Sequence, residues 1–108
     1  MKLILILIFS LFSVTSDAAD KKTERTWKAK CSSCHGADGK GDTEQGKKLG
    51  LADMATEAWQ KKFTDAQMKK SILEGINREE NGKKLEMKAF KNEGVSEEQV
   101  GSLIQWIR

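Results

Sequence analysis

The chain has 108 residues, with 19 Lys and Arg against 16 Asp and Glu, a net charge of +3 and no proline. This small basic excess argues against nucleic-acid binding. A chain of this size forms one domain with a marginal apolar core, which often depends on a disulfide, metal or cofactor. Its two cysteines lie in one short motif, so no disulfide framework is expected.

The N-terminal segment has the pattern of a secretory signal peptide. Lys2 precedes an apolar run from 3 to 11, which is too short for a membrane-spanning helix of about 20 residues. The sequence Ser16-Asp17-Ala18 fits the small-x-small cleavage rule. We therefore expect residues 1–18 to be removed and residues 19–108 to form a periplasmic domain without stable membrane insertion. Cleavage after Ser16 and an uncleaved anchor are the alternatives.

The first helix is predicted at about 21–34 and ends in the motif Cys31-Ser32-Ser33-Cys34-His35. Trp27, Cys31 and Cys34 recur at i, i+4 and i+7, which places them on one helical face. A Cys-x-x-Cys-His run is the attachment signature of c-type haem: two thiols bond to the porphyrin vinyl groups and the histidine ligates the iron. The motif therefore predicts one covalent haem c.

Other uses of the motif fit less well. Zinc needs four ligands, and the chain has only three Cys or His residues. A thioredoxin-like dithiol belongs in a βαβ unit, and the sequence shows no strand pattern. A simple disulfide would leave His35 without a role.

Further along the chain, a glycine-rich loop is expected at 36–50 and a weaker helix at 52–63. Thr64 and Gln67 form a capping box that predicts a helix ending at Gly75. Residues 77–94 are expected to form a polar loop without strands. Ser96 and Gln99 form a second capping box, with Val95 and Val100 as its hydrophobic staple, and the final helix buries a stripe of Val100, Leu103, Ile104 and Ile107.

The candidates for the sixth iron ligand are Met54, Met68 and Met87, because His35 is the single histidine. Met68 lies in the apolar stripe of a capped helix, where core packing is the better interpretation. Met54 follows the attachment loop closely and is also interpreted as core. Met87 lies in the expected polar loop, which could cross the far face of the haem. We therefore predict His35 and Met87 as the metal ligands, and Cys31, Cys34, His35 and Met87 as the cofactor-binding residues.

With these residues placed, the chain resembles the class I monohaem cytochromes c of bacterial periplasms over nearly all of its mature length. Met87-Lys88-Ala89-Phe90 is similar to the ligand segment of the family, and Trp27 and Trp106 occupy its aromatic positions on two crossing helices. Lys88 replaces the usual proline, and Thr23 stands where the family often has glycine. The resemblance implies an all-α cytochrome c fold of three to four helices wrapped around one haem.

Closed His/Met ligation predicts a one-electron carrier rather than an enzyme, shuttling electrons between redox proteins as a monomer. An open-site haem protein, such as a gas or redox sensor or a small oxidase with displaceable Met87, is the alternative class. A subunit dedicated to one membrane enzyme also remains open. An acidic partner could dock on a group of lysines near the motifs: Lys28, Lys30, Lys40, Lys88 and Lys91.

Overall fold

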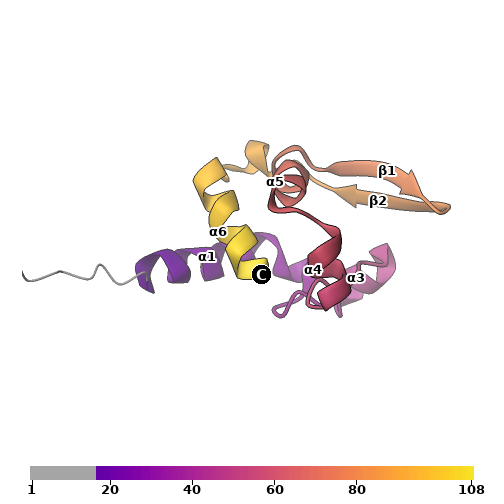
Figure 1. Cartoon of the computed structure of the whole chain (residues 1–108), viewed down its shortest axis with the longest axis horizontal. Coiled ribbons are helices and arrows are strands. Elements are labelled where there is room, and N and C mark those ends of the chain that lie inside the picture. Colours follow the sequence, from indigo (N-terminus) through magenta and orange to yellow (C-terminus); the bar gives the residue numbers. More distant parts are fainter. Residues whose placement is uncertain (1–16) are drawn as a thin grey trace, which may run out of the picture.

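The computed structural model describes residues 17–108, so the predicted leader lies outside the described residues except for Asp17 and Ala18 (Figure 1). In chain order the elements are α1 (Asp17–Lys30), α2 (Ser32–His35), α3 (Glu44–Leu49), α4 (Glu57–Lys62), α5 (Asp65–Glu74), β1 (Ile76–Glu80), β2 (Lys83–Met87), the 3-10 helix η1 (Phe90–Glu93) and α6 (Glu97–Ile107). No helix in this part of the chain is long and apolar enough to cross a membrane.

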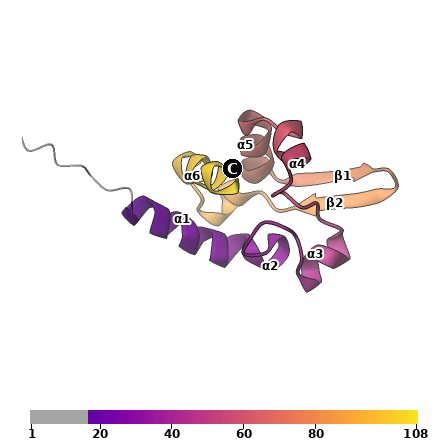
Figure 2. The same cartoon turned by 60° about the horizontal axis from the view of Figure 1, so that its bottom comes forward.

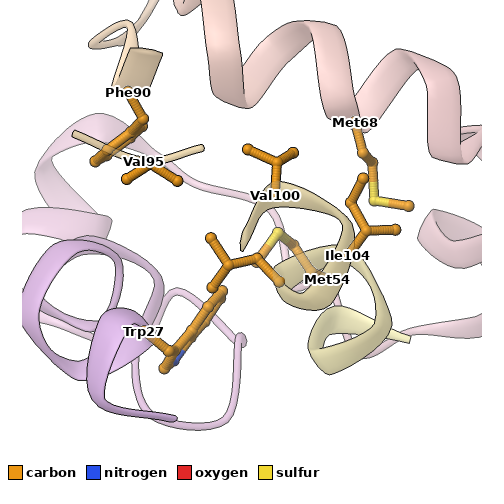
Figure 3. Close-up of a cluster of buried hydrophobic side chains, with 8 residues drawn as sticks. Trp27, Met54, Met68, Phe90, Val95, Val100 and Ile104 are labelled. Carbon is orange, nitrogen blue, oxygen red and sulfur yellow. The ribbon is translucent and has the colours of Figure 1, made fainter. Parts of the chain in front are cut away.

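The core forms where α6 packs against both α1 and α5. Val100 and Ile104 of α6 lie between Trp27 on one side and Met68 on the other, as Figure 3 shows. The buried apolar side chains are Trp27, Met54, Met68, Phe90, Val95, Val100, Leu103 and Ile104. The stripe predicted for the final helix is thus confirmed, with Ile107 half-buried at its end.

Both predicted capping boxes are present. The Thr64 hydroxyl accepts from the Gln67 amide while the Gln67 side chain accepts from the Thr64 amide, and Ser96 and Gln99 repeat this arrangement. These caps satisfy amide groups that a helix N-terminus leaves without intrahelical partners. Gly75, with a positive φ of 79°, ends α5 as predicted. The helices on both sides of the core are therefore correctly bounded by sequence.

The prediction that 77–94 forms a loop without strands is wrong. Ile76–Glu80 and Lys83–Met87 pair as an antiparallel hairpin, which extends from the body of the molecule (Figure 1). Asn81 and Gly82 form the turn with φ of 53° and 75°, the positive φ values that a two-residue Asn-Gly hairpin turn requires. Met87 therefore ends a strand rather than lying in a loop.

The first half of the chain also differs from expectation. The helix predicted at about 21–34 is interrupted at Cys31, which separates α1 from α2. The expected glycine-rich loop contains α3, capped by the Thr43 hydroxyl. The helix expected at 52–63 shortens to α4, which begins after the Thr56 cap. In both cases a single threonine at an N-cap decides where a short helix starts.

Candidate haem-binding site

The attachment motif occupies the junction of α1 and α2. The Cys31 amide donates to the Trp27 carbonyl, and the His35 amide donates to the Cys31 carbonyl, both at 2.9 Å. These i to i−4 bonds keep a helical path through the interruption, so Cys31 and His35 lie one turn apart on the same face. Both cysteines are free thiols and half-buried. The structure thus brings the three predicted attachment residues together.

Three successive carbonyls, the last two of the motif and the one that follows it, accept hydrogen bonds from groups outside the motif. The Cys34 carbonyl accepts from the Thr43 hydroxyl at 2.8 Å, and the His35 carbonyl accepts from the Gly41 amide at 2.7 Å. The Gly36 carbonyl accepts from Nε1 of Trp27 at 3.0 Å. These bonds satisfy carbonyls at the end of α2, where intrahelical partners run out, and the Gly36 carbonyl also accepts from the Gly39 amide at 3.3 Å. They fix the backbone that carries His35.

Close packing of α3 against α2 depends on Gly46. A Cβ atom at this position would lie 2.5 Å from the Cys34 carbonyl oxygen and 2.8 Å from Oγ1 of Thr43. Such distances are too short for a carbon side chain, so only glycine allows α3 to approach the attachment motif this closely. Thr43 and Gly46 were not singled out from the sequence as site residues. The N-cap pattern of Thr43 was the one sequence signal that could have identified them.

The His35 side chain has the properties of a neutral iron ligand. Burial lowers its pKa, because a charged imidazolium loses hydration inside the protein. Its Nδ1 atom is buried and has no hydrogen-bond partner among the described residues. The Trp27 ring packs beside it, with ring centroids 6.1 Å apart. A neutral imidazole has one nitrogen with a free lone pair, as axial ligation of a haem iron requires.

The thiol chemistry argues against a dithiol oxidoreductase. Burial raises the pKa of the Cys31 thiol to about 11, although the nearby Lys30 lowers it. A catalytic dithiol needs the opposite, a lowered pKa that produces thiolate near neutral pH. Two half-buried free thiols beside a neutral imidazole therefore fit covalent haem attachment better than thiol exchange.

The three methionines of the described chain occupy different environments. Met54 and Met68 are inside the core, at 8% and 5% exposed. Met87 is half-buried at the end of β2 and packs at the margin of the same core, as Cys31 does. Met87 and the attachment motif thus reach one apolar cluster from separate elements.

The family resemblance predicts that Trp27 and Trp106 lie near each other, and the structure confirms that they line the same cleft. Trp27 and Trp106 line a cleft of about 260 Å³ with Met54 and Gly39. Trp27 is almost fully buried in it, whereas Trp106 is 42% exposed. The crossing of α1 and α6 therefore supports the backbone immediately before the attachment motif.

Comparison with known families decides what this site is. The family model described as cytochrome c oxidase, cbb3-type, subunit III matches residues 18–107. The chain belongs to this family. It is a small monohaem c-type cytochrome, and its fold is the cytochrome c fold, mostly helical with a small two-stranded hairpin.

Solved structures support the same conclusion. The KustC0563 c-type cytochrome is 30% identical, with a TM-score of 0.65, and the match covers 80% of this chain and 93% of that one. A point mutant of the same protein gives 30% identity and a TM-score of 0.64, covering 80% and 94% of the two chains. Among curated proteins, no significant match was found. Family membership implies covalent haem c, and Cys31, Cys34 and His35 fit its attachment motif.

Proposed function

We propose that this cytochrome is an exported one-electron carrier in which His35 and Met87 are the two axial ligands. The observation that carries the proposal is the position of Met87. It is the methionine at the core margin, whereas Met54 and Met68 are committed to core packing. A side chain at the margin of the apolar cluster can turn toward a haem held by the neighbouring motif without opening a cavity.

Closed ligation explains why the protein would carry electrons rather than transform a bound molecule. When bound, haem c supplies a one-electron iron couple. His35 and Met87 would occupy both axial positions, so no substrate could reach the metal. The Met87 thioether is a soft neutral ligand that favours the reduced state and raises the potential relative to bis-histidine ligation. The buried core side chains exclude water, which also disfavours the extra charge of the oxidised state.

Electron carriers must dock on partners, and the lysines near the motifs divide into two groups. Lys28 pairs with Glu24 at 3.1 Å, and Lys88 lies 4.0 Å from Glu93. Among residues 17–108, Lys30, Lys40 and Lys91 make no ion pair of this kind, and Lys40 and Lys91 are exposed. We therefore propose that an acidic redox partner docks chiefly through these three lysines, with the cytochrome acting as a periplasmic monomer.

The ligand assignment can be tested by replacing each methionine with leucine. Leucine keeps nearly the same volume, so the core positions remain packed while the thioether is lost. We expect Met87→Leu to make the reduced protein bind carbon monoxide, with a shift of its visible bands. Met54→Leu and Met68→Leu are the matched controls and should leave the spectrum unchanged.

Each other outcome points to a different conclusion. If Met54→Leu or Met68→Leu opens the iron instead, the assignment of Met87 is wrong. If the unaltered protein already binds carbon monoxide, the sixth position is exchangeable and the protein belongs to the open-site class of sensors or small oxidases.

A further inference from the structure

A single lysine joins the hairpin that carries Met87 to the end of helix α3, which packs against the helix of the attachment motif. Nζ of Lys83 donates to the Gly50 carbonyl at 2.8 Å, between residues 33 positions apart in the chain. Gly50 is the C-cap of α3, and β2 packs against this helix (Figure 2). We call this hydrogen bond the hairpin tether.

The tether and the proposed ligand lie on the same face of one strand. Side chains alternate along a strand, so Lys83, Leu85 and Met87 share a face, and both Leu85 and Met87 are half-buried. Lys83 begins β2 and Met87 ends it, which separates them by about 13 Å along the strand. The opposite face carries Lys84 and Glu86, which form an exposed ion pair at 3.0 Å.

The hairpin has few other contacts that could hold it. Residues Asn77–Glu80 of β1 are all exposed, and a two-stranded hairpin is at most marginally stable without packing. The Gly50 end of the tether belongs to a well-supported helix, because α3 packs on α2 and the Thr43 hydroxyl donates to the Cys34 carbonyl. The tether therefore joins the element carrying Met87 to the element beside His35.

Gly50 is suited to accept this bond. Its φ of 61° is left-handed, and its amide closes α3 by donating to the Gly46 and Lys47 carbonyls. A Cβ atom at this position would collide with the end of the Lys83 side chain. Glycine is thus favoured at the left-handed helix end, and it leaves room for the ammonium group to reach the carbonyl.

We propose that Lys83 is a positioning residue for electron transfer, which holds Met87 on the iron by tying β2 to the end of α3. This inference rests on the proposed ligation by Met87. Loss of the tether frees the hairpin at its outer end, so the thioether leaves the iron more often. An external ligand then gains access at a rate set by how often Met87 dissociates.

The test compares Lys83→Gln with Lys84→Gln in the haem-loaded protein. Both variants remove one positive charge from the same strand, but only Lys83 reaches α3. The rate at which imidazole replaces the methionine ligand in oxidised protein is followed by visible absorption, well below the unfolding temperature. Loss of this solvent-exposed hydrogen bond predicts about fivefold faster exchange for Lys83→Gln. Lys84→Gln should match the unaltered protein, and Lys83→Arg, which keeps a long, positively charged donor, should recover most of the slow exchange.

If Lys83 only stabilised the fold, Lys83→Gln would lower the midpoint of urea unfolding without changing the rate at which imidazole replaces the methionine. Equal exchange in Lys83→Gln and Lys84→Gln, with the methionine ligand intact in the unaltered protein, would overturn this inference alone. Identical spectra of the unaltered protein and Met87→Leu would overturn the ligand assignment and the positioning role together. Gly50→Ala is a second test, because its added methyl group should displace the Lys83 ammonium. Adding Lys83→Gln to Gly50→Ala should then produce no further increase in the rate of imidazole exchange.

Discussion

Replacing Trp27 with phenylalanine tests how the attachment backbone is held. Trp27 is 3% exposed, and its Nε1 donates to the Gly36 carbonyl at 3.0 Å. Phenylalanine leaves that carbonyl with only the longer bond from the Gly39 amide at 3.3 Å, and loss of the Trp27 bond costs about 0.5–1.5 kcal/mol. The smaller ring also leaves a gap beside His35 that costs about 1 kcal/mol. We expect Trp27→Phe to lose about 1.5–2.5 kcal/mol of unfolding free energy, a substantial share of the roughly 5–15 kcal/mol available to a small domain.

Urea unfolding of the haem-loaded protein measures this loss directly. With a urea slope of about 1–3 kcal/mol/M, the midpoint of urea unfolding should fall by roughly 1 M. Trp106→Phe is the matched control, because Trp106 is 42% exposed in the same cleft and its replacement should change stability by less than about 0.5 kcal/mol. Equal midpoints for the two variants would refute the claim that the Trp27 hydrogen bond secures the attachment backbone.

Three further predictions concern a cap, the cofactor and the docking surface. Thr64→Ala removes one capping box and should lower unfolding free energy by about 1 kcal/mol in urea titrations. Cys31→Ser with Cys34→Ser prevents covalent attachment, and we expect poorly cooperative unfolding by circular dichroism; a sharp transition would contradict a haem-dependent core. Lys40→Gln should weaken the ionic-strength dependence of electron transfer to an acidic partner, whereas Lys61→Gln, which removes a lysine already paired with Glu57, should not.

The sequence was most informative where structure depends on neighbouring residues. Both capping boxes, the stop at Gly75 and the apolar stripe of α6 follow from local hydrogen bonding and helical spacing. The attachment motif is equally local, because a single helical turn places Cys31 and His35 on one face. These features required no knowledge of the tertiary fold.

The hairpin was missed although the sequence contains its signal. Asn81-Gly82 is a strong two-residue turn, and Leu85 and Met87 alternate with charged residues in β2. Because β-branched residues are nearly absent here, the composition of this charged hairpin indicates a loop. Strand propensity largely reflects packing context, and this hairpin is stabilised by its turn and cross-strand pairing instead.

Other parts of the site depend on contacts between residues far apart in sequence. The bond from Thr43 to the Cys34 carbonyl, the close approach at Gly46 and the hairpin tether at Gly50 all arise when α3 meets other elements. No local pattern specifies which carbonyl a distant side chain will reach. The assignment of Met87 as the sixth ligand stays a prediction, supported by its place at the core margin.

The visible absorption spectrum of the unaltered protein, oxidised and reduced, before and after carbon monoxide, tests the central claim most directly. We predict c-type haem bands that carbon monoxide does not shift, because His35 and Met87 close both axial positions. Bands that shift on adding the gas would contradict closed ligation and favour an open-site haem protein.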